Sequence, residues 1–152
     1  MNRDSVRPLL IIQTMNITLS FNEVKNIISK KTNNTINLDF TCVDYRTVKV
    51  SYKPMPFLPA VNVDVMVAKV DNSQLVLSYK ANPAVDMIIK GVSNYLDNHI
   101  PKEIIELDAS VQCVCINLDK IEQLQKPLEM VKIVDVYVEN NGLVCVLDII
   151  MI

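Results

Sequence analysis

The sequence has only two glycines, no tryptophan and a single histidine. With so few glycines, a glycine-rich loop that cradles phosphate is excluded. Aromatic residues make up 5% of the chain, and no basic stretch is interleaved with them. Nucleic-acid binding is therefore not expected, because neutralising phosphates requires clustered lysine and arginine. No segment approaches the roughly 18 unbroken apolar residues of a membrane-spanning helix.

The N-terminal segment lacks the features of a signal peptide, because its apolar run, Leu9 to Ile12, is short and no small-residue cleavage site follows. We expect a cytoplasmic protein if the chain is complete, and an exported or periplasmic protein if a signal peptide has been removed. Hydrophobic residues make up 50% of the 152-residue chain. This apolar surplus must fill a thick core, line a cavity or form an interface.

The most prominent predicted helix runs from Asn82 to His99. Asn82 suits the N-cap, Pro83 suits the first turn, and apolar side chains recur at helical spacing. They form one stripe: Val85, Ile88, Ile89, Val92 and Leu96. A shorter helix is predicted after Ser20, which is placed to form a capping box with Glu23. Its apolar face consists of Phe21, Val24, Ile27 and Ile28.

Seven segments are predicted as β-strands: six alternate between apolar and polar residues with the period of a strand, whereas residues 143–150 show little polar alternation. The seven are residues 36–42, 48–52, 61–68, 75–79, 105–115, 131–139 and 143–150, and residues 16–20 add a short strand or lead-in. Residues 105–115 form the longest alternation, and Gly142 after two asparagines predicts a type I′ hairpin turn with positive φ angles. Tight turns between strands require antiparallel pairing. Residues 1–152 are thus predicted as a single α+β domain, with one antiparallel sheet of about seven strands curled over two helices.

His99 is the only histidine and lies at the end of the predicted long helix. It is either a general base or a residue that the negative end of the helix dipole favours. No serine or cysteine nucleophile can be placed beside it from the sequence. We therefore expect a protein that is not an enzyme and has no cofactor.

The four cysteines lie in apolar, strand-like segments, where free thiols behave as small hydrophobic side chains. Cys113 and Cys115 lie on one face of a predicted strand. They form a zinc or redox site only if Cys42 or Cys145 and further ligands converge on them; otherwise they are packing residues, and we expect no metal. The strand carboxylates are predicted on the solvated face: Asp39, Asp64, Glu106 and Asp108.

Three stretches resemble small bacterial members of the tubular lipid-binding superfamily, which includes the bactericidal/permeability-increasing proteins. They are Leu19-Ser20-Phe21-Asn22-Glu23, the helix from Val85 to Leu96, and residues 115–124 followed by VKIVDVYVENNGLVCVLDI. The resemblance implies a strongly curved antiparallel sheet wrapped around the long helix, with an apolar tube between them that binds acyl chains, phospholipids or other apolar ligands. Members are usually exported or membrane-tethered, whereas this chain shows no export signal or lipoprotein cysteine near its start.

The first functional hypothesis is non-enzymatic binding of a lipid or other apolar ligand in a hydrophobic cavity between the sheet and the long helix, compatible with peripheral membrane contact. The predicted lining residues are Phe21, Val24, Ile27, Val85, Ile88, Ile89, Val92, Leu96, Val111 and Cys113. The same residues also fit a filled core. The alternative is a structural or interaction module that homo-oligomerises or docks a protein partner through an apolar surface, formed by Lys53–Pro59 and Leu143–Ile150.

Overall fold

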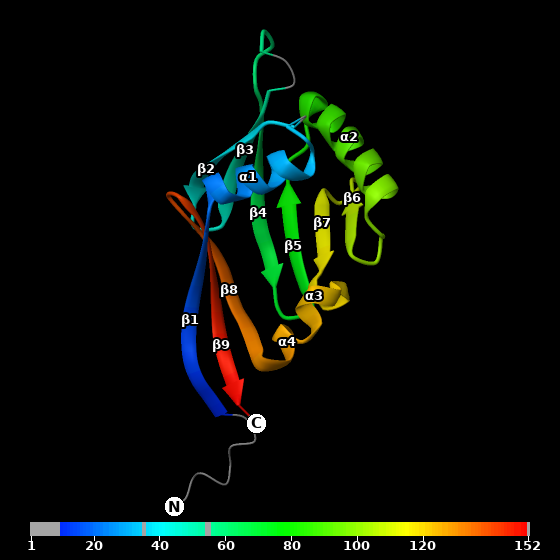
Figure 1. The fold of residues 1–152 in the computed structure, drawn as a ribbon. Coiled ribbons are helices and arrows are strands. Elements are labelled where there is room, and N and C mark those ends of the chain that lie inside the picture. The colour runs from blue at the N-terminus through cyan, green and yellow to red at the C-terminus, as the bar shows by residue number, and fades with distance from the viewer. Residues whose placement is uncertain (1–9, 35, 54–55, 152) are drawn as a thin grey trace, which may run out of the picture.

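The structure, a computed structural model, describes residues 10–34, 36–53 and 56–151 and contains two antiparallel sheets (Figure 1). The three-stranded sheet has the order β1-β9-β8 and consists of β1 (Leu10–Ser20), β8 (Val131–Glu139) and β9 (Gly142–Met151). The six-stranded sheet has the order β2-β3-β4-β5-β7-β6 and consists of β2 (Leu38–Asp44), β3 (Thr47–Tyr52), β4 (Val61–Val70), β5 (Gln74–Tyr79), β6 (Ile105–Asp108) and β7 (Cys113–Asn117). The helices are α1 (Phe21–Lys31), α2 (Pro83–His99), α3 (Glu122–Gln125) and α4 (Pro127–Met130), with a 3₁₀ turn at Leu118–Lys120.

The α+β class and the antiparallel pairing are confirmed, but the prediction of one curved sheet wrapped around one long helix is wrong. The three-stranded sheet stands beside the six-stranded one and extends past it, and the two helices lie over the six-stranded sheet (Figure 1). One cause is β1, which extends over eleven residues and pairs with β9 along its length, where the sequence indicated a short strand or lead-in at residues 16–20.

A second difference from the prediction is a turn inside residues 105–115, which the sequence predicted as one strand. The chain instead forms a hairpin of β6 and β7, with Leu107 opposite Val114. At the turn, the Asp108 carboxylate accepts hydrogen bonds from the backbone N–H of Ser110 at 3.0 Å and from its hydroxyl at 2.5 Å. Gln112 completes the reversal with a φ of 55°. These local side-chain bonds favour a turn over a continuing strand.

The last hairpin lies where it was predicted, between β8 and β9, but its turn differs from the expected type. Gly142 does not have a positive φ; among the residues described, only Asn33, Asn34 and Gln112 do. Gly142 instead opens β9 opposite Ser20. A Cβ there would press against the carbonyl oxygen of Leu19 and lie 2.8 Å from Cα of Ser20. The glycine is therefore required by close strand packing and not by the turn.

Both long helices begin as their capping residues predict. Ser20 Oγ accepts the backbone N–H of Glu23 at 3.1 Å, and the Glu23 carboxylate accepts the N–H of Ser20 at 3.0 Å, which completes the capping box. Asn82 Oδ1 accepts the N–H of Val85 at 2.9 Å. Of the proline-rich segment predicted as a contact surface, residues 54 and 55 lie outside the described residues.

One face of the six-stranded sheet is apolar, and we call it the inner face. The cross-strand register brings together Leu38, Phe40, Cys42, Val48, Val50, Tyr52, Val61, Val63, Val65, Val67, Leu75, Leu77, Tyr79, Ile105, Leu107, Val114 and Ile116. Helix α1 reaches this face through Phe21, whose ring stacks on Phe40 with centroids 6.0 Å apart. Helix α2 packs on it with Val85, which is fully buried.

The opposite face of this sheet is polar, as the alternation predicted. Its carboxylates are all exposed: Asp39, Asp64, Glu106 and Asp108. Lys25 forms an ion pair with Asp39, with a nitrogen–oxygen distance of 2.7 Å. Cys113 and Cys115 belong to this face, because they stand opposite Asp108 and Glu106 in the register.

The two sheets are joined by the turn between β2 and β3, which docks on β8. Arg46 pairs with Asp135 at 2.6 Å and also donates to the carbonyl oxygen of Val136 at 2.7 Å. The Tyr45 hydroxyl donates to Asp135 at 2.8 Å, and its ring stacks on Tyr137. Burial raises the pKa of Asp135, but the hydrogen bonds from Arg46 and Tyr45 outweigh it and hold that pKa below its ordinary value. We call Tyr45, Arg46, Asp135 and Tyr137 the inter-sheet cluster.

Candidate functional site

The residues predicted to line a cavity do not all meet in one place. In α2, Val85 is buried, Ile88, Ile89 and Leu96 are half-buried, and Val92 is exposed. In α1, Phe21 and Val24 are half-buried and Ile27 is exposed. The side chains of the two helices therefore cover the sheet without sealing it.

Val111 and Cys113 do not share the face of the other predicted residues. Val111 is exposed in the turn between β6 and β7. Because that turn reverses the chain, the inner positions of β7 are Val114 and Ile116, and Cys113 falls on the polar face. One signal in the sequence indicates this reversal: in the tripeptide Asp108-Ala109-Ser110, an aspartate can accept hydrogen bonds from the residue two positions later, which is typical of a turn.

The inner face is only partly covered. Among the described hydrophobic side chains of the inner face and of the helices packed on it, only three are buried: Val48, Tyr79 and Val85. Burial raises the pKa of Tyr79, with the carboxylate of Asp86 adding to the effect. An apolar layer with so few buried members still has accessible surface that favours contact with another apolar group.

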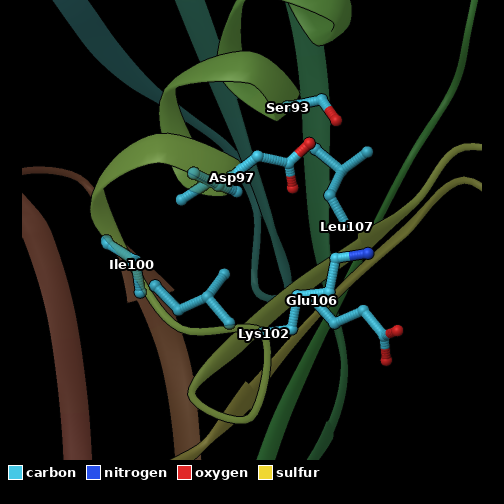
Figure 2. A pocket seen from close by; sticks show the side chains of 8 residues that line it. Ser93, Asp97, Ile100, Lys102, Glu106 and Leu107 are labelled. Atoms are coloured by element: carbon cyan, nitrogen blue, oxygen red, sulfur yellow. The ribbon is translucent and has the colours of Figure 1, made fainter.

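Beside the second half of α2 lies a small pocket of about 120 Å³. Its lining residues are Ser93, Leu96, Asp97, Ile100, Lys102, Ile105, Glu106 and Leu107. Figure 2 shows the helix residues Ser93 and Asp97 on one side, with Lys102, Glu106 and Leu107 across from them. Ligand pockets usually span roughly 300–1,000 Å³, so this space beside the long helix has room for a few water molecules and not for an acyl chain.

A larger opening of about 420 Å³ lies where the two sheets meet, and we call it the junction pocket. It is lined by Asp71, Asn72, Ser73, Leu128, Val131, Lys132, Ile133 and Ile150. The lining is apolar on β8, β9 and α4, whereas the turn between β4 and β5 and the lysine give it a polar rim. Its volume falls within the range of roughly 300–1,000 Å³ that is usual for small-molecule sites.

Asn72 holds the walls of the junction pocket together. Its amide nitrogen donates to the carbonyl oxygens of Val131 at 2.9 Å and Leu128 at 3.3 Å, and its Oδ1 accepts the N–H of Ile133 at 2.6 Å. Asp71 is held by hydrogen bonds from Ser73, which lower the pKa of its carboxyl group. Of the residues that line this pocket, only Ile150 belongs to a surface predicted from the sequence, the contact segment Leu143–Ile150.

The candidate reactive side chains are dispersed. His99 is exposed, with Nδ1 2.9 Å from the carbonyl oxygen of Tyr95 and its ring stacked on the Tyr95 ring. Cys42 lies on the inner face of the six-stranded sheet, whereas Cys113 and Cys115 lie on its polar face. Cys145 lies in β9, where burial raises the pKa of its thiol. Within residues 10–34, 36–53 and 56–151, no three His, Cys, Asp or Glu side chains converge to hold a metal ion.

The junction pocket is thus the larger of the two openings, is shallow and wide open to solvent, and offers apolar contact with a polar rim. In the described part of the chain, no helix combines the length and hydrophobicity that crossing a bilayer requires. No protein-family model, curated protein or solved structure matches this chain.

Proposed function

We propose that the protein is a non-enzymatic binder of an amphipathic ligand with an acyl chain, and that the ligand enters at the junction pocket. The observation that carries the proposal is the combination of a 420 Å³ opening, an apolar lining and a polar rim at the seam of two sheets. The incompletely covered inner face of the six-stranded sheet supports the same ligand class.

The binding energy in this proposal comes from burial of the acyl chain. Each methylene removed from water contributes roughly 0.8 kcal/mol before the cost of ordering the ligand is subtracted. Leu128, Val131 and Ile133 supply the apolar contacts, and the ammonium group of Lys132 at the rim suits an anionic head group. In this proposal the ligand binds at the junction pocket and not, as predicted from the sequence, beside the long helix, because the space beside α2 is too small for an acyl chain.

The test is a titration with cis-parinaric acid, a fatty acid that becomes fluorescent in apolar surroundings. We expect saturable binding to the wild-type protein. Leu128→Trp places a larger side chain in the junction pocket and should weaken binding by roughly tenfold, since about 1.4 kcal/mol of lost contact has that effect. Met66→Trp is the matched control, because Met66 is exposed on the polar face of the six-stranded sheet and should leave binding unchanged.

Circular dichroism and urea unfolding establish that both variants keep the fold. Native mass spectrometry of gently purified wild-type protein should also show an adduct of lipid size. Absence of saturable binding by the wild type, or equal affinity of Leu128→Trp and the wild type, would contradict the proposal.

A structural module that homo-oligomerises through apolar surface is the second candidate. It is favoured by Phe57 and Leu58, which are exposed in the proline-rich segment that the sequence indicated as a contact. The other predicted contact, Leu143–Ile150, forms the central strand β9, in which Val144 and Leu147 are buried. The fatty-acid titration separates the candidates, since saturable binding that Leu128→Trp weakens favours the first whatever the oligomeric state.

A further inference from the structure

The edge of β1 differs from every other sheet edge in the described part of the chain. We propose that β1 pairs antiparallel with β1 of a second copy, so that two three-stranded sheets join across a two-fold axis into one six-stranded sheet. Edge strands present a row of unpaired N–H and C=O groups, and natural proteins usually protect them with charge, proline, bulges or covering segments. Within the described residues, three of the four edge strands carry charged side chains and β1 carries none.

The three protected edges carry charged side chains. Strand β8 contains Lys132, Asp135 and Glu139, is bulged between Ile133 and Asp135, and is covered at Val138, whose N–H donates to the carbonyl oxygen of Tyr45 at 2.8 Å. Strand β2 contains Asp39 and Asp44. Strand β6 has only four residues, two of which are Glu106 and Asp108.

Strand β1 is the longest of the four edge strands, and its one irregularity, a bulge between Ile11 and Gln13, leaves residues 13–20 in a regular ladder with β9. Its eleven residues, LIIQTMNITLS, include no charged residue and no proline. It pairs with β9 on one side, and within the described residues no strand pairs with its other side. Near its end, Ile17 and Leu19 are exposed. A long, uncharged and partly apolar edge is a template for another strand.

The sequence of β1 is compatible with pairing to itself. In an antiparallel pair about a two-fold axis at Ile17, Asn16 faces Thr18, Met15 faces Leu19 and Thr14 faces Ser20, so polar side chains meet polar ones and apolar meet apolar. Threonine pairs and apolar pairs each contribute roughly 0.2–1 kcal/mol in such a ladder. No like charges oppose each other, because the strand has none. A two-fold interface of this kind is self-complementary and closes after two copies.

A matched pair of lysine variants tests the inference by sedimentation velocity over a range of protein concentrations. We expect the wild type to shift from 17.2 kDa to twice that mass as its concentration rises. Ile17→Lys introduces like charges at the paired edge and should weaken dimerisation by roughly tenfold or more. Val134→Lys is the control, since Val134 lies on the opposite edge of the same sheet and is 47% exposed, against 50% for Ile17. It should dimerise like the wild type.

Hydrogen exchange on the wild type supplies a second readout that needs no substitution. Amides of β1 should become more protected as the concentration rises, whereas amides of the short edge β6 should not. A wild type that stays at 17.2 kDa with unchanged exchange in β1, or equal weakening by both lysine variants, would overturn the inference. If the β1 amides gain protection from exchange only when a peptide of another protein is added, that peptide and not a second copy is the partner of β1, and the inference is wrong. Ligand binding at the junction pocket is independent of this edge, so Leu128→Trp should leave the mass unchanged.

Discussion

The two sheets bury their apolar side chains in different ways. The six-stranded sheet is wide, has one apolar face under two helices, and contributes Val48 and Tyr79 to the buried side chains, with Val85 from α2. The three-stranded sheet has half as many strands but contributes three: Val138, Val144 and Leu147. Val144 and Leu147 lie on opposite faces of β9, because they are an odd number of residues apart. The central strand is therefore covered on both sides.

The comparison extends to the edges. The wide sheet has charged edges and a partly accessible face, whereas the narrow sheet has a well-buried centre and an uncharged edge at β1. Surface that is suited to binding thus lies on the face of one sheet and on the edge of the other. We infer that stability is concentrated in β8 and β9, and that the wide sheet tolerates substitution on its apolar face.

The largest expected effect is loss of packing in the narrow sheet. Leu147 is 8% exposed, so Leu147→Ala should lower the free energy of unfolding by roughly 2–5 kcal/mol through lost burial and a cavity. Leu75→Ala is the counterpart on the half-buried inner face of the wide sheet and should cost clearly less. Urea unfolding of both variants measures the difference. Equal losses would remove the contrast between the two sheets.

The two glycines give the next comparison. Gly142→Ala should destabilise the protein by roughly 1–3 kcal/mol, because the added methyl group meets the backbone of Leu19 and Ser20, which cannot move without disturbing β1. Gly91→Ala, in the interior of α2, has open space around the new Cβ and should stabilise by roughly 0.5–1 kcal/mol. Thermal unfolding should shift in opposite directions. A stabilised Gly142→Ala variant would contradict the close packing of β1 on β9.

Local signals in the sequence predicted the helices and most turns well. The capping box of Ser20 and Glu23 and the N-cap Asn82 fixed the starts of α1 and α2, because each bond is made within three residues. The same local logic failed at residues 105–115, where a clean alternation conceals a turn. A strand and a tight hairpin show the same alternation, and only the side chains of Asp108 and Ser110 distinguish them.

The junction pocket could not be predicted in this way. It is held by Asn72, whose hydrogen bonds reach residues 56 to 61 positions further along the chain. In the sequence Asn72 is only a turn residue, and the apolar residues around the pocket are alternating strand positions like many others. The division into two sheets has the same origin, because pairing of β1 with β9 joins the two ends of the chain.

The smallest expected effect concerns the inter-sheet cluster that connects the two regions. Arg46→Met keeps much of the aliphatic stem but removes the charge, and at neutral pH it should cost roughly 1–2 kcal/mol through lost hydrogen bonds to Asp135 and Val136. The pKa of Asp135 is lowered in the folded state from its ordinary value of 3.8, so its stabilising contribution is present above that value. The contribution is lost as the pH falls through the lowered pKa. The difference between wild type and variant should therefore be constant near neutral pH and shrink in acid below 3.8.

Lys25→Met is the matched control for this prediction, because Lys25 is as exposed as Arg46 and also forms a short ion pair, but its partner Asp39 is 69% exposed against 23% for Asp135. An exposed pair contributes under about 1 kcal/mol and is screened by salt, so this variant should change the free energy of unfolding little. Urea unfolding across the acid range measures both variants. If Arg46→Met costs no more than Lys25→Met, the cluster does not hold the sheets together, and the contacts of β8 with β4 and β2 must do so by packing alone.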